Sequence, residues 1–350
     1  MARRLPLIAR ALLWFWGTLA AAMLVTAVVL QTMGPPPPAG PTMTADATPP
    51  SVILPVPAPV APPASRPGRD TPGPIASPDP GLLEVDPDDP AAMLPRIAAD
   101  GRAPMGVYAR GFDQSTRRPR IGLLFAGFGP SQADSEEAIR ALPGGVTLAF
   151  SPYGSHLPRL LDVARLAGHE YLLSLPMEPA GYPQNDAGDH ALLTTQDAQT
   201  NAAGLRWALS RMQGYVGVTG ALGPLRGERF AQASGPMDAM LHTLAARGLL
   251  YVDPGVAPGP LPYAWTRRVD LVVDEPAVRT EIDAKLAALE RIARDRGSAL
   301  GLAGVLRPLT VARVEAWADT LQARGLALAP VSALVQPPPL PRAGSAGASR

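Results

Sequence analysis

Short apolar runs alternate with helical segments along residues 120–335, and this alternation constrains the fold more than any other feature of the chain. The runs lie at 121–126, 146–150, 170–175, 215–219, 249–252, 269–273, 299–303 and 326–330. Between most of them, Leu, Ala, Ile or Trp recur at helical spacing, as in TVARVEAWADTLQARG. Seven or eight strand–helix units over about 215 residues favour a barrel of parallel strands over an open sheet.

Local signals mark the ends of several predicted helices. Thr194 and Asp197 resemble a capping box at the start of a helix. The predicted helix stops are glycines, which adopt the left-handed backbone conformation of helix C-termini most easily: Gly168, Gly248, Gly297 and Gly325. Whatever the exact sheet, the functional site of such a fold lies at the carboxyl ends of the strands.

The N-terminal residues predict a membrane anchor. Arg3, Arg4 and Arg10 precede an uncharged stretch at 11–33, long enough to span the roughly 30 Å hydrocarbon core. The positive flank predicts a cytoplasmic N-terminus and a single pass through a bacterial inner membrane, with the bulk of the chain periplasmic. A cleaved signal peptide is the alternative, although its apolar core is usually shorter.

Proline divides the remaining chain. Residues 35–90 hold 19 of the 43 prolines, and proline both removes a hydrogen-bond donor and fixes φ. We therefore expect the following organisation: 1–33, cytoplasmic tip and transmembrane anchor; 34–94, disordered Pro-rich linker; 95–335, folded domain; 336–350, disordered tail.

Composition excludes several classes of function. The 31 basic and 30 acidic side chains leave a net charge of +1, so nothing indicates a nucleic-acid partner. The absence of cysteine excludes disulfides and thiolate metal sites.

The segment from Gly127 to Gly129 ends an apolar run and precedes a helix, as a nucleotide-binding loop would. It lacks a third glycine at the helix start and the Lys-Ser/Thr pair of a phosphate loop, so we reject a nucleotide site. The histidines form no pair with ligand spacing. His169 precedes a strand, which predicts a structural role, and His242 lies within a helix, which predicts a residue of a helix face. His156 and His190 lie in loops near the expected site.

Seven sequence blocks, in this order, resemble the divergent polysaccharide deacetylase family over residues 95–334: IGLLFAGFG, LPGGVTLAFSPYG, AGHEYLLSLPMEP, YVGVTGALG, RGLLYVD, LERIARDRGSALGLA and LALAPVSAL. The resemblance implies a deformed (β/α) barrel. It also implies hydrolysis of acetyl groups on polysaccharide by a divalent metal such as zinc, held by one carboxylate and two imidazoles, with a second carboxylate accepting a proton from the bound water.

At the positions of the metal ligands, the sequence departs from that family. Ala126-Gly127 replaces an Asp-Asp pair, and Ser174 stands where a histidine precedes LPMEP. Ala221 replaces the next histidine, and Ala303-Gly304-Val305 replaces a Gly-His-Pro block. We therefore predict no metal site and no cofactor, because the two remaining carboxylates, Glu178 and Asp253, do not substitute for an Asp plus imidazoles.

Three functions remain open. The first is a glycan-binding or regulatory protein that has lost metal-dependent hydrolysis, with cell-envelope polysaccharide or peptidoglycan fragments as partner. The second is a hydrolase with a rearranged site around Glu178, Asp253, His156 or Asp186. The third is an envelope scaffold for another protein.

The candidate catalytic residues are Glu178 and Asp253, although Glu178 could instead only brace its loop. The candidate substrate-binding residues at strand ends and in adjacent loops are Tyr153, His156, Glu178, Tyr182, Asn185, Asp186 and Asp253.

Overall fold

A computed structural model describes Trp16 and residues 73–339 of the chain. The chain divides into two units, 1–57 and 58–350, and the sheet, its helices and the candidate site belong to the second. Three predicted segments lie largely outside the described residues. They are the anchor, of which only Trp16 is described, most of the linker and most of the tail. Within Trp16 and 73–339, no helix is both long enough and apolar enough to cross a membrane.

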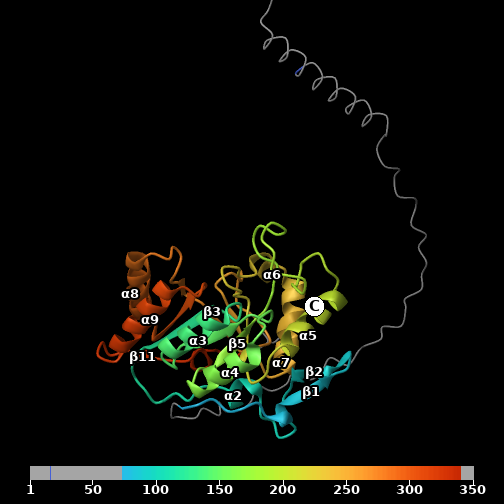
Figure 1. Ribbon diagram of the computed structural model, residues 1–350, viewed down its shortest axis with the longest axis horizontal. Coiled ribbons are helices and arrows are strands. Elements are labelled where there is room, and N and C mark those ends of the chain that lie inside the picture. The colour runs from blue at the N-terminus through green and yellow to red at the C-terminus, as the bar shows by residue number, and fades with distance from the viewer. Residues whose placement is uncertain (1–15, 17–72, 340–350) are drawn as a thin grey trace, which may run out of the picture. The chain divides into compact units, whose positions relative to one another are not determined.

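A curled sheet of parallel strands forms the centre of the domain (Figure 1). Its main path runs in the order β8-β7-β6-β5-β4-β3-β10-β9, and β11 pairs with β3 beside this path. The strands are β3 (Arg120–Phe128), β4 (Thr147–Phe150), β5 (Tyr171–Ser174), β6 (Gly217–Thr219), β7 (Leu250–Asp253), β8 (Thr266–Arg268), β9 (Leu271–Val272), β10 (Ser298–Ala303) and β11 (Ala327–Leu328). The predicted parallel strand–helix architecture is confirmed.

The two ends of the sheet path lie close together in the chain. Only residues 269 and 270 separate β8, at one end, from β9, at the other. The Val269 N–H donates to the Asp253 carbonyl at 2.9 Å, and the Asp270 N–H donates to the Leu300 carbonyl at 2.8 Å. This two-residue segment therefore joins β7 to β10 across the opening of the curled sheet.

Helices follow most of the strands, as the periodicity predicts. They are α3 (Gln132–Ala141), α4 (Leu157–Leu166), α5 (Ala198–Ser210), α6 (Glu228–Gln232), α7 (Ser234–Ala246), α8 (Arg279–Arg296) and α9 (Pro308–Leu321). The four predicted stop glycines all have positive φ. The expected capping box differs: Asp197 alone caps α5, accepting the Thr200 N–H at 2.7 Å, and Thr194 bonds elsewhere.

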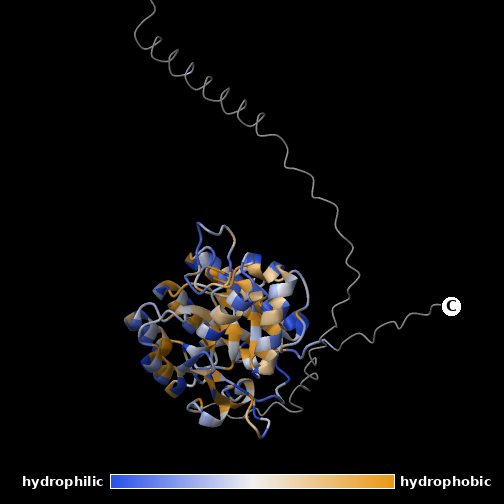
Figure 2. Ribbon diagram, turned by 90° about the vertical axis from the view of Figure 1, so that its right-hand side faces the viewer, coloured by the Kyte–Doolittle hydropathy of each residue, from blue (hydrophilic) through white to orange (hydrophobic). Residues whose placement is uncertain are grey.

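Successive residues of β3 face two different parts of the core. Leu123 and Phe125 pack in the cluster between sheet and helices, whereas Leu124 and Ala126 pack in the cluster inside the curled sheet. This alternation follows from the period of two of a strand, with both faces buried as in parallel sheets. Figure 2 shows hydrophobic residues on the central strands and more hydrophilic ones in the outer loops.

The segment at 329–336 crosses the amino-terminal ends of the strands. The Ala329 N–H donates to Ile121 at 2.8 Å, and the Val331 N–H donates to Thr147 Oγ1 at 3.0 Å. The Gln336 N–H reaches the Thr266 carbonyl at 2.8 Å. Between these contacts lies the short helix η2 (Val331–Ala333). Because this segment occupies the amino-terminal ends, the opposite ends of the strands form the candidate site.

The part before the barrel differs from the predicted linker, which extended to residue 94. Residues 80–95 form η1 (Pro80–Leu82) and an antiparallel hairpin, β1 (Leu83–Asp86) and β2 (Asp89–Pro95). The side chain of Arg247 holds the hairpin by donating to Glu84 Oε1 and to the Pro95 carbonyl, both at 2.8 Å. A short helix, α2 (Pro104–Val107), follows. Buried leucines offset the prolines here, because Leu82 and Leu94 are almost fully enclosed.

Candidate functional site

The positions that the family resemblance assigns to metal ligands lie at the carboxyl ends of β3, β5, β6 and β10. Ala126 and Ala221 are fully buried and carry only a methyl group. Ser174 is also buried, and its Oγ has no hydrogen-bond partner in the described part of the chain. No cluster of three His, Asp or Glu side chains able to hold a metal occurs among residues 73–339. The residues present therefore do not fit the metal of the family.

Backbone contacts occupy the space beside these positions. Gly127 has φ +90°, and a Cβ there would lie 3.1 Å from the Leu306 nitrogen. A Cβ on Gly304 would lie 3.0 Å from the Gly223 carbonyl oxygen. The end of β3 and the loops that follow β6 and β10 thus approach one another through glycine backbone, and a side chain at Gly127 or Gly304 would require its backbone neighbours to shift.

Asp274 fixes one of these loops. Its side chain is buried after β9 and accepts the Gly304 N–H at 2.9 and 3.0 Å and the Val305 N–H at 2.9 Å. The sequence analysis did not assign Asp274 to the site. The available signal was its position directly after an apolar run, at the carboxyl end of a predicted strand.

Glu178 holds its own loop in place. Its side chain is only 1% exposed, and Oε2 accepts both the N–H and the hydroxyl of Thr194 at 2.6 Å. Oε1 lies 3.0 Å from Arg229 Nη1 as an ion pair, without the alignment of a hydrogen bond. The Glu178 carbonyl also accepts the N–H groups of Arg229 and Phe230 at the start of α6. These contacts show that Glu178 has a structural role, which is to hold its loop against Thr194 and the start of α6.

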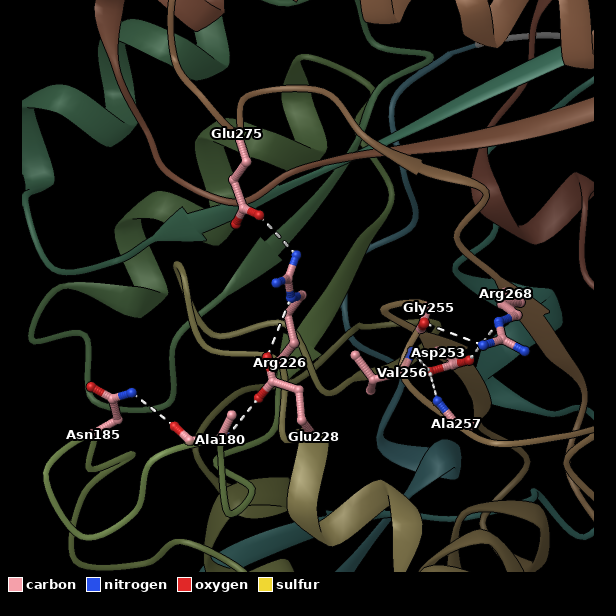
Figure 3. A network of polar contacts seen from close by, with 10 residues as sticks. All are labelled: Ala180, Asn185, Arg226, Glu228, Asp253, Gly255, Val256, Ala257, Arg268 and Glu275. Atoms are coloured by element: carbon pink, nitrogen blue, oxygen red, sulfur yellow. Dashed lines mark hydrogen bonds and ion pairs between the residues drawn. The ribbon is translucent and has the colours of Figure 1, made fainter.

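Asp253 is likewise bonded to its surroundings (Figure 3). Its Oδ1 accepts the N–H groups of Val256 and Ala257 at 3.1 and 3.2 Å, and Oδ2 lies 3.4 Å from Arg268 Nε. Arg268 also donates to the Gly255 carbonyl at 3.2 Å. Asp253 therefore secures the loop after β7 against β8.

Of the other predicted site residues, four lie together at one loop and His156 lies apart from them. Tyr182, Asn185 and Asp186 lie on the exposed loop 180–190, where Asn185 donates to the Ala180 carbonyl at 2.8 Å. The hydroxyl of Tyr153 joins this loop by accepting the His190 N–H at 3.3 Å.

Arg229 links the loop to Glu178, because the same Nη1 also lies 3.4 Å from the Tyr182 carbonyl. His156 stands apart at the start of α4, with Nδ1 2.8 Å from Ser155 Oγ. Within residues 73–339, no hydrogen bond or ion pair joins His156 or Asp253 to another predicted site residue.

A charged network that the sequence analysis missed spans the same end of the sheet (Figure 3). Arg226 lies 3.0 Å from Glu275, in the loop after β9, and 3.4 Å from Glu228 on α6. Glu228 accepts the Ala180 N–H at 3.0 Å. Arg226 thereby connects the loop at 180–190 with the loop that precedes α8.

The remaining histidines lie away from this end. His169 is fully buried before β5, with its ring nitrogens 2.8 Å from the Val146 carbonyl and 3.1 Å from the Ile139 carbonyl. His242 lies on α7 and stacks on Tyr263. The position of His169 agrees with its predicted structural role, and His242 is exposed on a helix face, as predicted.

Comparison with known proteins yields one family and several similar structures. Residues 123–335 match the model of the family described as divergent polysaccharide deacetylase. A crystal structure of an uncharacterized protein from Agrobacterium tumefaciens C58 is 34% identical, with TM-score 0.65, covering 70% of this chain and 100% of that one.

Two further structures match at lower similarity. A putative polysaccharide deacetylase from Mycobacterium smegmatis is 13% identical, with TM-score 0.44, covering 66% of this chain and 96% of that one. The catalytic domain of a peptidoglycan N-acetylglucosamine deacetylase from Eubacterium rectale is 12% identical, with TM-score 0.37, covering 65% and 94%. A search of curated proteins found no match.

Proposed function

This chain belongs to the divergent polysaccharide deacetylase family, and we propose that it binds a cell-envelope polysaccharide without hydrolysing it through a metal. Its partners in this proposal are peptidoglycan fragments or a related glycan. The ligand lies at the carboxyl ends of the strands, beside the loop at 180–190. The protein then acts as a glycan-binding or regulatory member of its family.

The residues and the backbone packing at the carboxyl ends of the strands are the observation that supports this proposal. Alanine and glycine occupy positions where the family resemblance implies acids and imidazoles, and backbone fills the adjoining space at Gly127 and Gly304. The two surviving carboxylates, Glu178 and Asp253, are buried and bonded to protein groups. A general base must reach a substrate proton or its water directly, and neither carboxylate is free to do so.

The exposed loop at 180–190 supplies the chemistry for binding instead. Tyr182 offers an apolar ring face to a pyranose, and Asn185 and Asp186 offer hydrogen-bond groups to its hydroxyls. Two side chains hold this loop: Arg229 contacts the Tyr182 carbonyl, and Glu228 accepts the Ala180 N–H. The loop is thus supported by two charged side chains at the start of α6.

Hydrogen exchange of the full chain, with and without soluble peptidoglycan fragments, tests the proposed site. We expect added protection in residues 150–156 and 180–190, and Tyr182→Ala should reduce that protection. Protection confined to the outer helices α3, α8 and α9 would contradict glycan binding here and would favour a protein scaffold.

We also propose that an inner-membrane anchor places residues 34–350 in the periplasm. The support is the sequence alone: three arginines precede the uncharged segment 11–33. A reporter that is active only in the cytoplasm, fused after Arg350, should stay silent in cells. Strong reporter activity would reverse this topology.

A further inference from the structure

An exposed tyrosine marks the edge of the proposed glycan site. Tyr153 follows β4, and 41% of it is accessible to solvent. One neighbour is Trp207 of α5, whose ring centroid lies 5.2 Å from that of Tyr153 at an interplanar angle of 40°. Tyr153 therefore combines contact with an aromatic neighbour and substantial exposure.

The surroundings hold this ring firmly. The ring of His190 stacks on Trp207 with centroids 3.7 Å apart and planes at 13°, and the main-chain N–H of His190 donates to the Tyr153 hydroxyl. Gly188, at φ +100°, passes so close that a Cβ there would lie 2.6 Å from that hydroxyl. A ring fixed in this way loses little conformational entropy when a ligand stacks on it.

Two carboxylates lie on the loop that contacts the Tyr153 hydroxyl. Asp186 Oδ1 accepts the Gly188 N–H at 2.9 Å, and Asp189 lies between Gly188 and His190 in the chain. Burial, together with the carboxylates of Asp189 and Asp186, raises the pKa of the Tyr153 hydroxyl. Both side chains are exposed, and neither forms an ion pair with any residue in the described part of the chain. Cations also lie in this region: the Arg211 guanidinium, 5.4 Å from the Trp207 ring centroid, donates to the Pro152 carbonyl, and Arg229 lies 3.4 Å from the Tyr182 carbonyl on the other side of the loop sequence.

We propose that Tyr153, Asp186 and Asp189 bind a 2-amino sugar in its deacetylated, cationic form. The pyranose C–H face stacks on the tyrosine ring, and the ammonium group lies near the two carboxylates and the electron-rich ring face. An N-acetylated sugar offers the same stacking face but no charge. This inference rests on the proposed glycan-binding function and specifies which sugar the site prefers.

Calorimetry of the full chain with two soluble probes tests the preference. The probes are the hexamers of glucosamine and of N-acetylglucosamine, at pH 6 and low ionic strength. We expect the glucosamine hexamer to bind about fivefold more tightly, which corresponds to two exposed ion pairs. The difference should shrink in 0.5 M salt, since salt screens exposed charges.

Variants separate charge from stacking. Asp189→Asn and Asp186→Asn should each lower affinity for the glucosamine hexamer about twofold and leave that for the acetylated hexamer unchanged. Tyr153→Ala should weaken both by about tenfold, because it removes the stacking face that both sugars use. Matched controls elsewhere on the surface are Asp319→Asn, on α9, and Tyr263→Ala, whose tyrosine is 42% exposed; neither should change binding.

The outcomes distinguish this inference from the function on which it rests. Equal binding of the two hexamers, or unchanged binding by Tyr153→Ala, would overturn the preference or its location while glycan binding stands. If no glycan binds at all, both proposals fail.

Discussion

Glu170 is the residue whose loss should most disturb the amino-terminal end of the barrel. It is fully buried before β5 and accepts four hydrogen bonds from three separate segments. The donors are the Arg110 N–H at 3.0 Å, the Thr147 hydroxyl at 3.0 Å, and the N–H and hydroxyl of Ser332 at 2.9 and 2.5 Å. This carboxylate therefore fastens the crossing segment 329–336 to the sheet.

The expected magnitude follows from the groups left behind. Glu170→Ala removes the acceptor of two main-chain N–H groups, those of the half-buried residues Arg110 and Ser332, and each unsatisfied group costs about 1–3 kcal/mol. Two effects reduce this loss. The hydroxyls of Thr147 and Ser332 can rotate, and removing the buried carboxylate recovers part of its desolvation penalty. We expect the free energy of unfolding to fall by about 3 kcal/mol, and by about half as much for Glu170→Gln, which keeps one acceptor oxygen.

Urea unfolding of the full chain at pH 7, followed by circular dichroism, measures this change. Glu281→Ala, at an exposed position in α8, is the matched control and should stay within about 0.5 kcal/mol of the wild type. A double-mutant cycle between Glu170→Gln and Ser332→Ala should show coupling of about 1 kcal/mol. A loss below about 1 kcal/mol for Glu170→Ala would refute the reasoning.

Three further predictions concern the strand ends and the surface. Calorimetry of the full chain with Zn²⁺ should show no binding tighter than about 0.1 mM, as expected for isolated carboxylates; a submicromolar site would contradict this. Gly127→Asp should destabilise the fold more than Gly101→Asp in urea unfolding, because both have positive φ but only Gly127 has a backbone neighbour within 4 Å; equal losses would contradict the crowding argument. Hydrogen bonds from Arg159 and Gln132 lower the pKa of Glu136 to about 2, so the stability advantage of wild type over Glu136→Gln should be complete above about pH 4.5 and disappear as the pH falls through about 2.

The sequence predicted most of the barrel because its strands and helices have clear periods. It did not predict β8, Thr266–Arg268, which contains two arginines and no apolar run. It also missed the hairpin of β1 and β2. Pro87 and Pro90 suggested a linker, yet Pro87 lies in the turn and Pro90 near the exposed start of β2, positions where a strand pair tolerates proline.

The site was harder to predict than the fold, because its contacts join residues far apart in the sequence. Asp274 meets Gly304 thirty positions later, and Arg226 meets Glu275 across 49 positions. Spacing along one chain shows neither partnership. The sequence could locate Glu178 at a strand end, but only the structure shows that Thr194 and Arg229 occupy its carboxylate.

Tyr153 illustrates the same difficulty. Its position after β4 placed it in the candidate site, and the structure brings it to the loop at 180–190. Its association with Trp207, on α5, depends on how that helix packs. Helical periodicity alone did not separate Trp207 from the apolar residues of the helix core.

A single measurement by ¹H NMR tests the central claim, which is that the protein binds a glycan without metal-dependent hydrolysis. The full chain is incubated with partially acetylated glucosamine oligomers and Zn²⁺, and the same sample reports both saturation transfer to the sugar ring protons and the methyl signal of free acetate. We predict saturation transfer that Tyr153→Ala reduces, with no acetate above the protein-free control. Acetate that accumulates in proportion to protein, or a complete lack of saturation transfer, would contradict the account.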